Sequence, residues 1–229
     1  LPKADVIIGS TPCAEFSILK KNRTYDMTLT NHFLKIVNDY KPKYWMLENV
    51  PGISKFLTVP FNILKRCIAG NYPYPTPTHA SFSNQTLENK PLHSWIRFRE
   101  IKYPDGGKPF SKKAITGAFR RANEMGKKKC NFMPQFIDDG DVLPTITSSE
   151  FHGIRASCTI VYDHSKLRPL SFRECTRAQS FPDDYVFVGT QAQCYHQVGD
   201  AVPPLRTKAI GDTIRANEEE TEECIETRV

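Results

Sequence analysis

Two short apolar runs, with an amphipathic stretch between them, constrain the fold of this chain most. The first run, Asp5–Ser10, stops abruptly at a glycine and a serine, as a buried strand does, and Tyr44–Leu47 is the second. Thr28–Asn38 lies between them, and its apolar residues recur at helical spacing. We therefore predict a strand–helix–strand unit, which is the building block of a parallel sheet.

A cysteine follows the first predicted strand, and a glutamate follows the second. Cys13 lies in a loop that Pro12 stiffens, and Glu48 comes directly after Tyr44–Leu47. In open α/β folds ligands bind at the carboxyl edge of the sheet, where both residues would face the same crevice. A lone cysteine is more often a small buried hydrophobe than a nucleophile, so both interpretations of Cys13 stay open at this point.

Four short motifs occur in the order in which the DNA cytosine-C5 methyltransferases carry them. Pro12-Cys13 resembles the fourth motif of that family, and Glu48-Asn49-Val50 resembles the sixth. Arg168–Asp183 is similar to the ninth motif and Tyr195–Pro204 to the tenth. Each match alone is weak, but four matches in the family's order indicate a relationship that extends over most of the chain.

The resemblance implies methyl transfer from S-adenosylmethionine to C5 of a flipped-out cytosine in DNA. In this family's chemistry Cys13 adds as a thiolate to C6 of the ring, which makes C5 nucleophilic enough to accept the methyl group. Glu48 would hold the N3 edge of the ring and share a proton with it. Asn49 is expected to organise the loop through local hydrogen bonds. The eighth motif is degraded here, and only Arg66 carries over from it as a third catalytic candidate.

The same likeness assigns the cofactor site to Pro12, Leu29, Gly199, Asp200 and Ala201. Asp200 stands where the family usually has asparagine, which adds negative charge beside a cationic cofactor. For Leu29, a place in the core of its helix is an equal alternative. The family's Phe-x-Gly-x-Gly loop does not occur in this sequence. We therefore expect most of the cofactor site to come from an N-terminal segment of the same chain or from a partner subunit.

Basic residues gather in two places that could contact DNA. The formal net charge is +6, and Lys112–Lys129 carries a single acidic residue, a pattern that fits a nucleic-acid partner without requiring one. Because C5 is not reachable inside a duplex, the cytosine must be flipped out while the phosphates beside it are held. A solvated basic loop is the alternative for the segment after Cys13. The candidate DNA-binding residues are Ser17, Lys20, Lys21, Arg23, Arg120, Arg121, Lys127 and Lys128.

We predict an α/β fold with a mostly parallel sheet flanked by helices, of the S-adenosylmethionine-dependent methyltransferase type and incomplete at its N-terminus. A proline-rich stretch is the expected boundary between a catalytic α/β part, 1–79, and a small irregular target-recognition region, 80–150. Residues 151–229 would return to the catalytic domain. Further expected elements are helices at Lys112–Glu124, Arg173–Gln179 and Pro204–Arg215 and a strand at Ser157–Tyr162.

Cysteine usage limits the setting in which the chain works. The seven cysteines form no CxxC pair, and the sequence shows no signal peptide and no apolar run of membrane length. We expect a reducing intracellular compartment, which would be bacterial or phage-infected cytoplasm or a nucleus, with neither disulfides nor a metal site. Two other functions remain open: a tRNA cytosine-C5 methyltransferase, which shares these motifs, and a catalytically decayed DNA-binding module.

Overall fold

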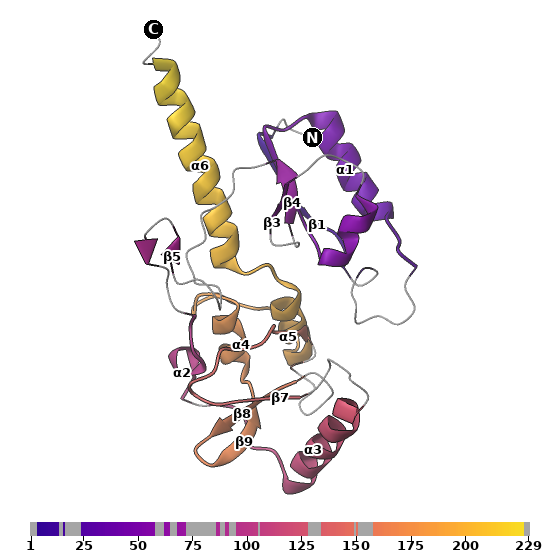
Figure 1. The fold of residues 1–229 in the computed structure, drawn as a ribbon, viewed down its shortest axis with the longest axis vertical. Helices are drawn as coiled ribbons and strands as arrows, with labels where there is room; N and C mark the ends of the chain where they lie inside the picture. The colour runs from indigo at the N-terminus through magenta and orange to yellow at the C-terminus, as the bar shows by residue number, and fades with distance from the viewer. Residues whose placement is uncertain are drawn as a thin grey trace. The chain divides into compact units, whose positions relative to one another are not determined.

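The computed structural model describes residues 4–13, 16, 24–57, 62–64, 68–71, 86–87, 90–91, 95–104, 106–127, 134–148, 150 and 158–226. The chain divides into two compact units (Figure 1). The first unit comprises Leu1–Pro75 and Ala209–Val229, and the second comprises Thr76–Lys208. Within the described ranges, no helix is both long enough and apolar enough to cross a membrane.

The first unit is built on a four-stranded sheet with the strand order β1-β2-β4-β3. β1 pairs in parallel with β2, whereas β4 pairs antiparallel with both β2 and β3. Three strands therefore run in one direction, and β4 runs in the other. The strands are β1 (Val6–Ser10), β2 (Tyr44–Glu48), β3 (Asn62–Leu64) and β4 (Ile68–Asn71).

Helix α1 (Thr28–Tyr40) makes the crossover that a parallel pair of strands requires. It packs on the sheet through Phe33, which contacts the core formed by Trp45 and Leu47 of β2. Gly9 of β1 permits this approach, because a Cβ at that position would lie 2.4 Å from the ring of Phe33. The predicted strand–helix–strand unit is confirmed.

The opposite face of β2 packs against α6 (Pro204–Glu226). Met46 forms a core cluster with Ile210, and Tyr44 packs against that cluster. The hydroxyl of Tyr44 donates to Glu218 Oε1 over 2.6 Å. Because α6 runs to Glu226, it is longer than the predicted helix, and its C-terminal part from Ala209 belongs to the first unit.

Strand β1 lies at an edge of the described sheet and is less buried than we predicted. Val6 is 40% exposed and Ile8 is 57% exposed, whereas Trp45, Met46 and Leu47 of β2 are all buried. The prediction of a buried first strand is therefore wrong for the described part of the protein. An apolar run shows that a strand can be covered, but it does not show which neighbours cover it.

The second unit contains a three-stranded sheet made of β7 (Gln135–Ile137), β8 (Thr159–Asp163) and β9 (Lys166–Pro169). β7 and β8 are parallel, and β8 and β9 form an antiparallel hairpin. His164 and Ser165 in the hairpin turn both have positive φ, as the tightest two-residue hairpin turns require.

Helices cover both faces of this sheet. α3 (Lys112–Lys127) packs on one face through Ala118, against Cys158 and Ile160. The other face contributes Val161 to a core shared with α2 (Phe98–Ile101), α4 (Phe172–Ala178) and α5 (Gln191–Asp200). The remaining elements are the 3-10 helix η1 (Pro51–Phe56) and the short strands β5 (Thr86–Leu87) and β6 (Lys90–Pro91).

The predicted α/β class is confirmed, and the helices expected in the second half of the chain are present as α3, α4 and α6. The expected strand near residue 160 is β8. The compact units divide at Pro75 and Lys208. The functional division at residues 79 and 150 is a different statement, about where target recognition lies, and it stays a prediction.

Candidate active site

The parallel pairing of β1 and β2 brings their carboxyl ends to the same edge of the sheet. Ser10, the last residue of β1, is the register partner of Glu48, the last residue of β2. The Ser10 hydroxyl donates a hydrogen bond to Glu48 Oε2 over 2.8 Å. Cys13 is exposed and lies on the loop that follows Ser10. The two strand ends that carry the candidate thiol and carboxylate are therefore neighbours.

Asn49 ties the cysteine loop to the end of β2. Its side chain is 2% exposed, and Nδ2 donates to the backbone oxygen of Thr11 over 2.9 Å and to Thr11 Oγ1 over 3.0 Å. Its Oδ1 accepts from the backbone N–H of Val50 over 2.8 Å. Thr11 Oγ1 also lies 3.0 Å from the hydroxyl of the buried Thr30 on α1. Asn49 thus organises the loop by local hydrogen bonds, as expected.

The far side of the cysteine loop rests on the 3-10 helix η1. The backbone N–H of Phe16 donates to the oxygen of Cys13 over 3.0 Å, which turns the chain, and the Phe16 ring is 2% exposed. That ring lies 5.7 Å from Phe56 and 6.3 Å from Tyr25. Gly52 of η1 is required here, because a Cβ would stand 2.2 Å from the Phe16 oxygen. The aromatic cluster and the close contact with Gly52 therefore support the cysteine loop on its η1 side.

The predicted catalytic and cofactor residues fall into three groups. Cys13, Glu48 and Pro12 are described in the first unit, where Leu29 on α1 is 56% exposed beside Thr30, the partner of Thr11. Gly199, Asp200 and Ala201 lie in the second unit, at the end of α5. Outside the described residues lie Arg66 and five of the candidate DNA contacts, Ser17, Lys20, Lys21, Arg23 and Lys128.

Comparison with known proteins decides the family. The sequence model for the C-5 cytosine-specific DNA methylases matches residues 1–69 and 70–216, which is nearly the whole chain. The chain belongs to this family. The expected relationship is confirmed, and cytosine methylation is the activity that the family's name carries.

Individual methylase relatives resemble the chain along most of its length. The type II methyltransferase M1.HphI of Haemophilus parahaemolyticus is 25% identical over 263 aligned residues, which cover 93% of this chain and 68% of the relative. M.NgoFVII of Neisseria gonorrhoeae is 27% identical, covering 89% and 67%. The solved structure of the Entamoeba histolytica methyltransferase EhMeth superposes with a TM-score of 0.60 at 12% identity, covering 93% and 77%, and supports the fold alone.

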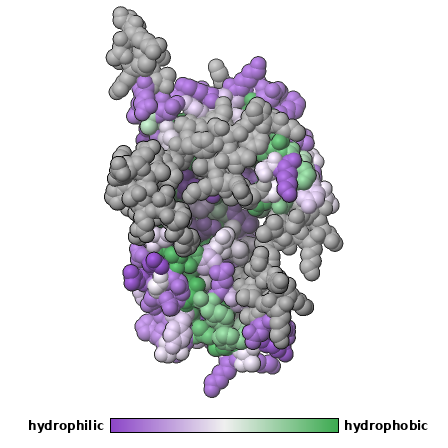
Figure 2. Space-filling model, in the orientation of Figure 1, coloured by the Kyte–Doolittle hydropathy of each residue, from purple (hydrophilic) through white to green (hydrophobic). Residues whose placement is uncertain are grey.

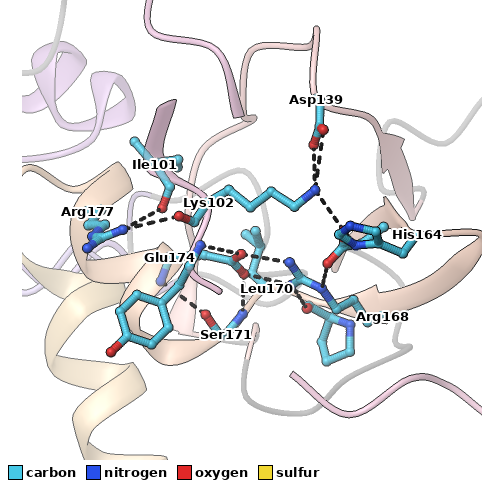
Figure 3. Close-up of polar contacts among 12 residues, drawn as sticks. Ile101, Lys102, Asp139, His164, Arg168, Leu170, Ser171, Glu174 and Arg177 are labelled. Atoms are coloured by element: carbon cyan, nitrogen blue, oxygen red, sulfur yellow. Dashed lines mark hydrogen bonds and ion pairs between the residues drawn. The ribbon is translucent and has the colours of Figure 1, made fainter. Parts of the chain in front are cut away.

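The ninth methylase motif forms a buried ionic network in the second unit (Figure 3). Arg168 and Glu174 are 3% and 0% exposed, and two hydrogen bonds of 2.8 Å each join the guanidinium to the carboxylate. Arg168 Nε also donates to Asp163 over 2.8 Å. Glu174 accepts from the backbone N–H groups of Tyr103 and Ser171. The buried ion pairs of the motif therefore hold α2, α4 and the β8–β9 hairpin together.

Asp163 links this network to the solvent. Lys102 Nζ lies 2.7 Å from Asp163 Oδ1, and Arg168 binds the other oxygen. The Lys102 ammonium group, with the Arg168 guanidinium beside it, holds the pKa of Asp163 well below its usual range. At the other end of the motif, the more exposed Arg177 binds Asp183 over 2.5 and 2.8 Å. The motif thus has a buried ion pair at its start and a more exposed ion pair at its end.

The tenth methylase motif supplies a close backbone contact. A Cβ on Gly199 would lie 2.2 Å from the backbone nitrogen of Ser148 and 2.6 Å from the carbonyl carbon of Thr147. Glycine at this position lets the end of α5 rest directly on the segment before Glu150. This packing accounts for Gly199 without a ligand, and the assignment of Gly199, Asp200 and Ala201 to the cofactor stays a prediction.

The described candidate DNA contacts lie on α3. Lys113, Thr116, Gly117, Arg120 and Arg121 line a shallow hollow of about 490 Å³, on the side of α3 that does not carry Ala118. The rings of Phe119 and Phe136 stack nearby at 4.7 Å and are 47% and 38% exposed. Figure 2 shows that the surface of the second unit carries hydrophobic residues beside hydrophilic ones. Lys127, another candidate DNA contact, is the last residue of α3.

Sequence reasoning missed the hydrogen bond from Ser10 to Glu48 in the first unit and the Arg168–Glu174 pair in the second. Ser10 could have been found by pairing the two predicted strands in parallel, since both end at the same edge. Ser171 followed by Glu174 is a capping-box pattern, and the structure confirms that box at the start of α4. The reach of Glu174 to Arg168 depends on tertiary packing, and no local pattern signals it.

Proposed function

We propose that the chain carries the catalytic site of a DNA (cytosine-5-)-methyltransferase that acts on a flipped-out cytosine through a covalent bond from Cys13 to C6. One observation carries the proposal. An exposed cysteine follows the end of β1 on a loop held by Asn49, and Glu48 ends the neighbouring parallel strand β2 at the same edge of the sheet. A decayed binding module would have no need to maintain this arrangement.

Each residue has a distinct part in the proposed reaction. The Cys13 thiolate forms a bond to C6, and the electron density that reaches the N3 edge is met by a proton shared with Glu48. C5 then takes up the methyl group, and loss of the C5 proton together with departure of the Cys13 sulfur restores the aromatic ring. Cysteine suits this cycle because it is both a strong nucleophile and a competent leaving group.

The residues assigned to S-adenosylmethionine fit that cofactor only in part. S-adenosylmethionine supplies an electrophilic methyl group when it is bound. Pro12 and Leu29 offer exposed apolar surface next to the Thr11–Thr30 contact, which suits an adenine ring. Gly199 is turned against the backbone of Ser148, and Asp200 beside it is exposed, as are His196 and Gln197 of the same motif. We propose that Pro12 and Leu29 contribute to the cofactor site and that Asp200 faces the cationic end.

Further strands are proposed to complete the cofactor site by adding to β1. The described sheet gives β1 one strand neighbour, and Val6 and Ile8 are exposed on the face that α6 covers over β2. An open strand edge with apolar side chains favours pairing with another segment. That segment would be an N-terminal part of the same protein or a partner subunit.

Base-resolved methylation mapping and covalent trapping test the proposed function. In a host that expresses the full-length gene, bisulfite sequencing is expected to reveal new 5-methylcytosine in DNA. A duplex with 5-fluorocytosine at the target site should then trap the enzyme at Cys13 in the presence of S-adenosylmethionine, because fluorine cannot leave as a proton does. Cys13→Ser should abolish the adduct.

Three results would contradict the proposal. Unmethylated DNA beside methylated tRNA would favour the tRNA methyltransferase. Specific DNA binding without methylation of either nucleic acid would favour the decayed module. An adduct at another of the seven cysteines would overturn the role of Cys13.

A further inference from the structure

A hydroxyl and the candidate catalytic carboxylate meet at the edge of the sheet. Ser10 and Glu48 are register partners on parallel strands, so their side chains leave the sheet on the same face. The distance from Ser10 Oγ to Glu48 Oε2 is 2.8 Å. The Ser10 hydroxyl is the donor in this contact, and the Glu48 carboxyl oxygen accepts. The serine side chain has a single bond to rotate before its oxygen, and the strand therefore fixes where that oxygen lies.

This contact differs in kind from those of Asn49. Asn49 is buried and holds the backbone of Thr11, so it places the cysteine loop. Ser10 is exposed and binds only one oxygen of Glu48 in the contact described, which leaves Oε1 available to a ring. A glutamate side chain without such a partner must be ordered by the substrate itself, at a cost in conformational entropy.

We propose that Ser10 is a positioning residue that orients the Glu48 carboxylate toward the N3 edge of the target cytosine. The inference rests on the proposed function, since it names a residue that acts through Glu48 in that reaction. Ser10 does not touch the ring; it fixes Oε2 so that Oε1 meets the base. The effect belongs to the reacting state, in which the contact between Glu48 and the ring strengthens.

The experiment measures single-turnover transfer of tritiated methyl groups by the full-length enzyme to unmethylated bacterial genomic DNA. Ser10→Ala is expected to lower the rate about tenfold and leave the DNA concentration that gives the half-maximal rate within about twofold, because the hydrogen bond to Glu48 is lost without any loss of phosphate contacts. Ser10→Thr keeps a hydroxyl at an exposed strand position, where a β-branched residue is well accepted, and should restore most of the rate. The unfolding midpoints of both variants should match the parent.

A double-mutant cycle tests whether Ser10 acts on the rate through Glu48. In a Glu48→Gln background, Ser10→Ala is expected to cause little further loss, because the group that it orients has been changed. The inference is overturned if Ser10→Ala transfers at the parent rate, if Ser10→Thr is as slow as Ser10→Ala, or if Ser10→Ala costs the same in both backgrounds. An inactive parent enzyme would overturn the proposed function instead, so the two failures are distinguishable.

Discussion

Arg168 and Glu174 carry opposite charges that have both been removed from water. The pair is held by two short hydrogen bonds, and Glu174 accepts two more from backbone N–H groups. Such a pair contributes little net stability when it is intact, because desolvation offsets the attraction. Loss of one partner is costly, because it strands the other charge in the interior.

We therefore expect Glu174→Ala to lower the free energy of unfolding by about 3–5 kcal/mol in urea titrations followed by circular dichroism. Asp183→Ala is the matched control, since it breaks the more exposed pair with Arg177 in the same motif and should change stability only slightly. Equal effects of the two substitutions would show that burial does not set the cost.

Glu150 is a second buried acidic residue, and it has no cation among its described hydrogen-bond partners. It is 3% exposed and accepts from the backbone N–H and the hydroxyl of Thr159. Burial raises the pKa of Glu150 to about 7 from an ordinary value of 4.5. The folded protein therefore binds a proton that the unfolded chain has released, between pH 4.5 and pH 7.

Stability should consequently fall as the pH rises through this window, by on the order of 3 kcal/mol for this group, and should not change further above it. Glu150→Gln keeps an acceptor for Thr159 and removes the charge. We expect the variant to be more stable than the parent at pH 8 and similar to it near pH 5, as measured by urea unfolding. A variant that is less stable than the parent at pH 8 would contradict this account.

Two glycines in helices illustrate how packing between elements decides the effect of one methyl group. A Cβ on Gly199 in α5 would overlap the backbone of Ser148, whereas a Cβ on Gly211 in α6 would meet nothing within 4 Å. Backbone atoms cannot step aside as a flexible side chain can. The end of α5 must therefore move if a side chain is introduced.

We expect Gly199→Ala to destabilise the protein by roughly 1–3 kcal/mol, as overpacking does, in thermal or urea unfolding. Gly211→Ala should be neutral or stabilise by up to about 1 kcal/mol, because alanine favours a helix. If both substitutions change the free energy of unfolding equally, the close contact of Gly199 with Ser148 does not constrain the folded protein in solution.

Elements with strong local signals could be predicted from the sequence, whereas those fixed by distant partners could not. α1 lies where helical spacing placed it, α3 covers the helix predicted at Lys112–Glu124, and β2 is the predicted second strand. The short strands β7 and β9 were missed because Gln135–Ile137 and Lys166–Pro169 carry no alternating pattern long enough to register. They are strands because β8 lies between them.

The same division holds for the candidate site. Cys13 and Glu48 could be placed together because the carboxyl ends of parallel strands share an edge, which is a rule of topology. The hydrogen bond from Ser10 needed the exact register of the strands, and Thr30 needed the position of α1 over Thr11. Such details follow from packing and cannot be derived from the spacing of residues along the chain.

At the scale of the whole molecule, the basic surface of α3 is expected to contribute to DNA affinity through phosphate contacts. Each phosphate contact releases counterions, so its loss flattens the salt dependence of binding. Arg120→Gln should weaken binding to DNA of any sequence and reduce the slope of log K against log salt by about 1, in fluorescence anisotropy titrations. Lys35→Gln on α1 is the charge-matched control. Equal slopes for both variants would remove α3 from the interface.

The cofactor prediction also belongs to this scale, because its assigned residues are divided between the two units. We expect this 229-residue chain alone to bind S-adenosylmethionine weakly in isothermal titration calorimetry, and a protein with strands added at β1 to bind it tightly. Tight binding by the 229 residues alone would show that the site is misplaced. Absence of binding by the extended protein would argue for the decayed module.

The contact between Gly199 and Ser148 also sets a rule for building hybrid enzymes. A designer who replaces residues 80–150, the predicted target-recognition region, would place new backbone against α5 at Thr147 and Ser148. A splice point upstream of Pro144 would keep the native contact between Gly199 and Ser148, whereas a splice point at residue 150 would place foreign sequence in that contact. Donor sequences should therefore end before Pro144, or α5 should be exchanged together with the segment that it contacts.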